Sequence, residues 1–103
     1  MTNAARARCI VECFWAGVRE QDLRDLDRRV AAALAALAGE GPGVRYLGWL
    51  LVVDDEVALL LFDGPMGSVR RVAEQARVPF GRILRAVPGP WPPTVAAEKE
   101  VVS

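Results

Sequence analysis

The stretch from Val44 to Asp63 is almost continuously apolar, which predicts two strands joined by an acidic turn at Asp54-Asp55. A half-buried antiparallel strand alternates apolar and polar residues, because one of its faces meets water. Here both faces are apolar. Strict alternation places two sets of side chains on opposite faces of the first strand: Leu47, Trp49 and Leu51 on one, and Tyr46, Leu50 and Val52 on the other. We therefore expect both faces of this sheet to be covered.

Two helices and two further strands are predicted around this hairpin. Apolar residues recur every three or four positions from Glu20 to Ala38 and from Ser68 to Arg77, which is typical of amphipathic helices. The segments RCIVECFW (Arg8–Trp15) and RILRAV (Arg82–Val87) have the composition of short strands. The order strand-helix-strand-strand-helix-strand predicts an α+β, ferredoxin-like βαββαβ fold. Right-handed crossovers then place both helices on one face of the sheet.

Two helices can cover only one face of a small sheet, so we expect a second copy of the chain to cover the other. The predicted assembly is a homodimer of the dimeric α+β barrel type, with a cavity between the sheets or between sheet and helices. Residues 8–87 form the predicted ferredoxin-like domain. Residues 1–7 are a predicted flexible N-terminus, and residues 88–103 a proline-rich C-terminal tail without periodicity.

Charge and composition limit the partners. The formal net charge is +0, so the chain lacks the basic excess that nucleic acids and acidic membranes attract. No apolar stretch approaches the roughly 20 residues of a membrane helix, and the N-terminus lacks a secretory hydrophobic segment. We expect a cytoplasmic protein in which Cys9 and Cys13 are free thiols. Four residues along a strand span about 13 Å, which is too far for a disulfide.

Glu12 is the candidate catalytic residue, because it is a carboxylate in the middle of a strand predicted to be central. Burial raises the pKa of a carboxyl group toward neutrality, where it can act as a general acid or base. The alternative is a structural ion pair with Arg8, Arg45 or Arg85 on neighbouring strands.

Aromatic residues are concentrated on the predicted core strands, as in the walls of small-molecule pockets. We single out Trp15, Tyr46 and Trp49 as candidate substrate-binding residues, and Arg45 as a cation that could steady developing negative charge. The alternative is an ordinary aromatic core or dimer interface. A metal site at the turn Asp54-Asp55-Glu56 would need further oxygen ligands, so we predict none.

The chain resembles the DUF4242 family of small actinobacterial ferredoxin-like proteins, which includes a nickel-binding protein. The resemblance covers about residues 8–87 and is carried by the order and spacing of five segments: IVECFWAGV (Ile10–Val18), DLRDLDRR (Asp22–Arg29), VRYLGWLLV (Val44–Val52), DDEVALLLFDGP (Asp54–Pro65) and VRRVAEQARVPFGRI (Val69–Ile83). It implies the same fold and a homodimer. Relatives commonly have a small or polar residue where this chain has Trp49, which predicts a remodelled pocket.

Two classes of function follow from these observations. The first is a cofactor-independent enzyme of isomerase or cyclase type, in specialised metabolism, acting on a small hydrophobic molecule in an aromatic pocket. The second is a protein that binds nickel or another divalent metal, as the resemblance implies. Nickel favours imidazole ligands and the chain has no histidine, so the first class is the main prediction. A non-catalytic structural or interaction module is the third possibility.

Overall fold

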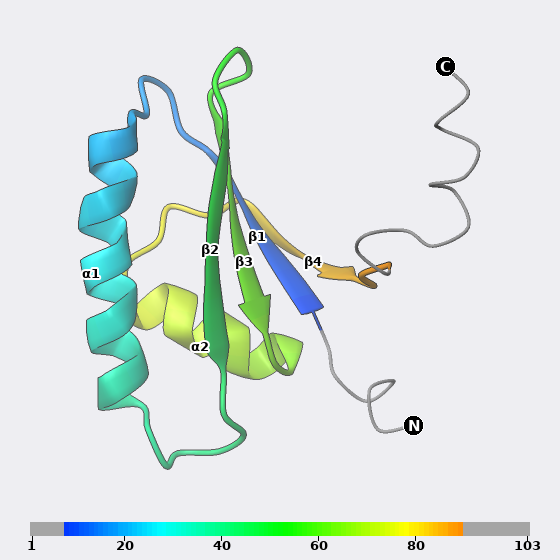
Figure 1. Cartoon of the computed structure of the whole chain (residues 1–103). Coiled ribbons are helices and arrows are strands. Elements are labelled where there is room, and N and C mark those ends of the chain that lie inside the picture. Colours follow the sequence, from blue (N-terminus) through cyan, green and yellow to red (C-terminus); the bar gives the residue numbers. More distant parts are fainter. Residues whose placement is uncertain (1–7, 90–103) are drawn as a thin grey trace.

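The computed structural model describes residues 8–89 and shows four strands and two helices in the predicted order. The elements are β1 (Arg8–Phe14), α1 (Glu20–Ala36), β2 (Arg45–Val52), β3 (Val57–Asp63), α2 (Met66–Gln75) and β4 (Arg82–Ala86). The strand order is β2-β3-β1-β4, and every neighbouring pair is antiparallel. Both helices lie on the same face of the sheet (Figure 1). The α+β ferredoxin-like fold class is thus confirmed. The predicted N-terminal segment and the tail beyond Gly89 lie outside the described residues.

The helices begin and end where local chemistry allows it. At the start of α1, the backbone N–H of Arg19 donates to Asp22 Oδ2 at 2.9 Å, so an acidic third residue compensates for an arginine at the cap. The second helix starts two residues earlier than predicted, at Met66, because Pro65 precedes it with φ −65° and fits a helix entry. It ends before Arg77, whose φ of 59° is left-handed.

The core lies between the sheet and the two helices. It contains the alternating residues of the central strands β1 and β3, and the apolar stripes of α1 and α2: Cys9, Val11, Cys13, Ala58, Leu60, Phe62, Leu23, Leu26, Val30, Val69, Val72 and Ala73. Both cysteines are buried free thiols. Burial raises the pKa of the Cys13 thiol to about 11, so at neutral pH this side chain is a small neutral hydrophobe.

A β-bulge in β2 corrects the predicted alternation of its side chains. The register with β3 runs Tyr46 to Phe62 and then Gly48 to Leu61, so one residue of β2 is extra. Gly48 has φ +120°, which residues with a side chain rarely adopt. Beyond the bulge every side chain changes face, and Trp49 therefore shares the helix-covered face with Tyr46. Strict alternation had placed these two aromatic residues on opposite faces.

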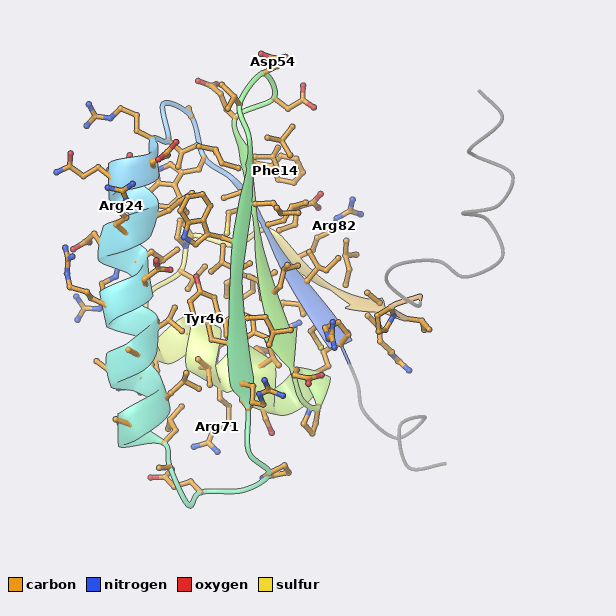
Figure 2. All side chains as sticks on the ribbon, in the orientation of Figure 1. Phe14, Arg24, Tyr46, Asp54, Arg71 and Arg82 are labelled. Carbon is orange, nitrogen blue, oxygen red and sulfur yellow. The ribbon has the colours of Figure 1, made fainter. Side chains whose placement is uncertain are left out.

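The opposite face of the sheet has no covering element among residues 8–89. Apolar side chains protrude from it, with exposed fractions of 63% for Phe14, 57% for Leu50 and 38% for Val52. Figure 2 shows Phe14 and Arg82 on the side of the sheet away from α1. We call this surface the open face. Within the described part of the chain, neither helix has the length and hydropathy needed to cross a membrane.

Candidate functional site

The predicted site residues divide between the two faces of the sheet. Trp15, Tyr46 and Trp49 pack against the core on the helix-covered side. Glu12 and Arg45 alternate with core-facing residues in their strands and therefore lie on the open face. The structure thus places the three aromatic residues on one side of the sheet and the predicted catalytic carboxylate on the other.

Glu12 forms an ion pair with Arg82, whose Nε donates to Glu12 Oε1. The partner is Arg82 rather than Arg8, Arg45 or Arg85, because Arg82 lies directly opposite Glu12 in the register of β1 and β4. Arg85 lies opposite Cys9, on the other face of that strand pair. The Glu12 side chain is 15% exposed and its partner 62%, so the ion pair sits at the edge of the open face.

Asp63 is the second carboxylate of the open face, and it lies near two arginines, Arg8 and Arg45. Arg8 Nε donates to Asp63 Oδ1 at 3.3 Å, and Arg45 Nη1 lies 3.9 Å from Asp63 Oδ2. Arg8 and Arg45 flank Asp63 because they lie opposite it on the strands either side of β3. Arg45 therefore belongs to an ion-pair group at one end of the sheet, on the face opposite to its neighbour Tyr46.

A group of three polar side chains on the helix-covered side joins α1 to β2. The Tyr46 hydroxyl donates to Asp27 Oδ1 at 2.6 Å, and the Trp49 indole N–H donates to Asp27 Oδ2 at 3.2 Å. All three residues are half-buried. Figure 2 shows Tyr46 in the space between α1 and β2. We call this group the carboxylate clamp, and the inner side of α1, from Asp27 to the C-terminal end of the helix, the seam.

Sequence reasoning missed Asp27, although a signal for it exists. Asp27 comes four residues after Leu23 and three before Val30, so it lies at the border of the buried stripe of α1. An acidic residue at such a position needs donors from the element that covers the stripe. The two donors come from β2, and both point to Asp27 only because the bulge turns Trp49 to the same face as Tyr46.

The electrostatics of the clamp keep the tyrosine protonated. Burial raises the pKa of Tyr46, and the hydrogen bond to Asp27 and the charge of that carboxylate raise it further. Its hydroxyl therefore stays a donor across the physiological range. Each carboxylate oxygen has a second lone pair, so Asp27 can still accept a hydrogen bond or a proton from a bound molecule. The clamp combines a positioned carboxylate, a phenol and an indole surface.

A cavity of about 250 Å³ lies further along the seam, where α1 ends. It is lined by the end of α1, the following loop and residues of α2: Leu34, Leu37, Ala38, Gly39, Glu40, Gly41, Pro42, Gly43, Val44, Ser68, Arg71 and Val72. Leu34 comes seven residues after Asp27, which is about 10 Å along a helix. The clamp does not line the cavity; it stands two helical turns away on the same seam.

Among residues 8–89, no group of three or more potential metal-ligating side chains comes together. The acidic turn after β2 is exposed, and one of its carboxylates is engaged with the main chain: Glu56 Oε2 accepts from the Gly17 N–H at 3.0 Å. This contact ties the turn to the end of β1.

Comparison with known proteins returned no family model, no curated protein and no solved structure that matches this chain. The resemblance to the DUF4242 family therefore stays a prediction. What the fold and the site define is a small ferredoxin-like protein with a carboxylate clamp and, two helical turns further along α1, a cavity.

Proposed function

We propose that this protein binds a small hydrophobic molecule along the seam, from the cavity at the end of α1 toward the clamp, and that it is a cofactor-independent enzyme of isomerase or cyclase type. The observation that carries the proposal is the carboxylate clamp, in which Tyr46 and Trp49 both donate to Asp27. The cavity on the same seam supplies apolar wall from Leu34, Leu37 and Val44. Aromatic and aliphatic walls with a few fixed polar groups are typical of small-molecule sites.

In this proposal Asp27 takes the acid-base role that sequence reasoning gave to Glu12. A general base has to reach the proton that it moves, and it works best beside the substrate surface. Glu12 lies on the open face in an ion pair with Arg82, whereas Asp27 lies on the seam beside two aromatic side chains. The Tyr46 hydroxyl positions Asp27 for this role, because its raised pKa keeps it a hydrogen-bond donor to that carboxylate. Trp49 orients the substrate.

Binding is tested with octan-1-ol, a neutral apolar probe, followed by two-dimensional NMR on the full chain. We expect shifts at the amides of Leu34 and Val44 and at the indole N–H of Trp49. Asp27→Asn should change the Trp49 indole signal without abolishing binding, because the apolar wall is intact. Shifts confined to the open face, around Leu50, or no shifts at all, would contradict the proposed site.

We also propose that the open face makes the protein a homodimer. Strands of about seven residues and a four-stranded sheet give a face of roughly 400 Å² in projection, and protruding side chains increase the accessible area. A standard interface buries about 800 Å² on each partner, so this face supplies a large part of one. Its apolar centre and its charged groups at Glu12–Arg82 and at Asp63 match the usual division into core and rim.

Sedimentation of the full chain at low micromolar concentration tests this assembly. We expect a dimer for the wild type and a monomer for Leu50→Glu, which places a charge among the apolar side chains of the open face. Val53→Glu is the matched control, because Val53 is 72% exposed in the turn after β2 and should leave the dimer intact. A wild-type monomer, or equal effects of the two variants, would refute the interface.

A further inference from the structure

The cavity at the end of α1 is bordered by a contact between a loop and a helix. Arg71 of α2 donates from Nη1 to the Glu40 carbonyl at 3.1 Å and from Nη2 to Glu40 Oε1 at 3.0 Å. One guanidinium group thus holds both the main chain and the side chain of Glu40. Figure 2 shows Arg71 below Tyr46, toward the loop between α1 and β2. We call this contact the Arg71–Glu40 latch.

The latch is weak by construction. Both side chains are about half exposed, at 52% for Arg71 and 55% for Glu40, and exposed ion pairs of this kind contribute little to stability. Glu40 stands between Gly39 and Gly41, the second of which has φ +117°, and a Cβ at either glycine would meet no atom within 4 Å. The Glu40 side chain is itself largely exposed, so its carboxylate can leave Arg71 and be solvated by water.

The lining of the cavity divides into an apolar wall and a charged end. Leu34, Leu37, Val44 and Val72 form the wall, and Ser68 adds a hydroxyl group. Among the lining residues, all of which belong to the described part of the chain, only Glu40 and Arg71 carry charge. When the Glu40 carboxylate leaves, a guanidinium remains beside an apolar cavity smaller than the roughly 300–1,000 Å³ of most ligand sites.

We infer that this cavity takes a small apolar molecule that bears a carboxylate, and that the ligand carboxylate replaces the Glu40 side chain on Arg71. The inference rests on the proposed function, because it names the class of molecule that the seam would bind. A guanidinium matches a carboxylate through two parallel hydrogen bonds, which a neutral group cannot reproduce. At Arg71 the carboxylate of the ligand replaces the carboxylate of Glu40. The ligand in addition buries its apolar chain in the cavity, and this burial favours the exchange.

The test is calorimetric titration of the full chain with octanoate and with octan-1-ol, which share a chain length and differ in charge. The wild type should bind octanoate more tightly than the alcohol. Arg71→Met should weaken octanoate binding by roughly tenfold or more, the range expected for lost hydrogen bonds to a charged group, and leave the alcohol unchanged. Glu40→Gln should strengthen octanoate binding by a factor of up to about five, because the internal competitor loses its charge.

Two further variants keep the result interpretable. Arg70→Met removes a neighbouring charge of α2 that lies over the Phe80 ring, 5.7 Å from its centroid, and should leave octanoate binding unchanged. Arg71→Lys keeps the charge without the fork and should lose part of the affinity. Melting curves confirm that each variant is folded.

The outcomes separate the two proposals. Equal binding of octanoate and octan-1-ol, equal losses in Arg70→Met and Arg71→Met, or weaker octanoate binding in Glu40→Gln would overturn the latch while the seam remained a binding site. Binding of neither probe would overturn the proposed function together with this inference.

Discussion

Tyr46→Phe tests whether the carboxylate clamp holds α1 against the sheet. The substitution removes one hydroxyl and leaves the ring, which packs against Phe62 with centroids 5.0 Å apart. The lost interaction is a 2.6 Å hydrogen bond to the carboxylate of Asp27. Hydrogen bonds to charged groups are worth about 1.5–3 kcal/mol, and half-burial of both partners favours the lower end.

We therefore expect Tyr46→Phe to lower the free energy of unfolding by about 1.5 kcal/mol. For a domain of this size the corresponding fall in Tm is roughly 6–12 °C. Thermal and urea unfolding followed by circular dichroism would measure both quantities. All variants must be compared at one protein concentration, because the Tm of a dimer depends on it.

The matched control is the same substitution in an Asp27→Ala background. There the tyrosine hydroxyl has already lost its acceptor, so removing it should cost less than about 0.5 kcal/mol, and the double-mutant cycle isolates the bond itself. If Tyr46→Phe in the wild-type background also lowers the free energy of unfolding by less than about 0.5 kcal/mol, the clamp does not stabilise the contact between α1 and the sheet. An equal cost in both backgrounds would assign the effect to something other than Asp27.

Three further predictions follow from the same contacts. Tyr46 is the sole tyrosine of the sequence, so tyrosinate absorbance near 295 nm reports it alone. Since its pKa is raised in the folded protein, the phenol should stay protonated above pH 10, and the protein should lose stability there. Tyrosinate formation at pH 10 with unchanged circular dichroism would be inconsistent with this prediction. Gly48→Ala should destabilise the protein by about 1–3 kcal/mol, because φ is +120° at that position. Gly67→Ala within α2 should be neutral or stabilising by up to about 1 kcal/mol, so equal urea midpoints for the two variants would contradict the bulge. The Cys13 thiol, with its pKa raised to about 11, should react with a thiol reagent at pH 8 far more slowly in the native protein than in urea, and equal reaction rates would count against its burial. The stability of the fold should also decrease as the pH rises from 9 toward 11, because the thiol of the unfolded chain ionises first.

The fold was predictable because its determinants are local and redundant. The helical repeat of α1, the apolar run of β2 and β3 and the breaks at Gly64-Pro65 each identify an element within a few residues. Once the order βαββαβ is known, right-handed crossovers leave few topologies. The pairing of Arg8 with Asp63, from β1 to β3, follows directly from that topology.

The candidate site was only partly predictable. Composition and position singled out Tyr46 and Trp49, but the pocket assembled from the sequence also contained Glu12 and Arg45, which lie on the open face. The bulge at Gly48 decides which residues of β2 face the helices, because one extra residue moves every later side chain to the other face. A lone glycine inside a strand is a recognisable signal for a bulge, yet it does not fix where the register shifts.

By itself, the sequence determined the elements, their order, the α+β class and the excess of apolar surface on the sheet, since each depends on residues close together in the chain. Only the tertiary structure decided that Asp27 meets Tyr46 and Trp49, and that Glu40 meets Arg71, across 19, 22 and 31 residues respectively. Side-chain partners at such separations depend on the register of one strand and the rotation of one helix. A one-residue shift in the register of β2, or in the rotation of α1, would separate Asp27 from Tyr46 and Trp49 while the hydrophobic pattern of the sequence stayed the same.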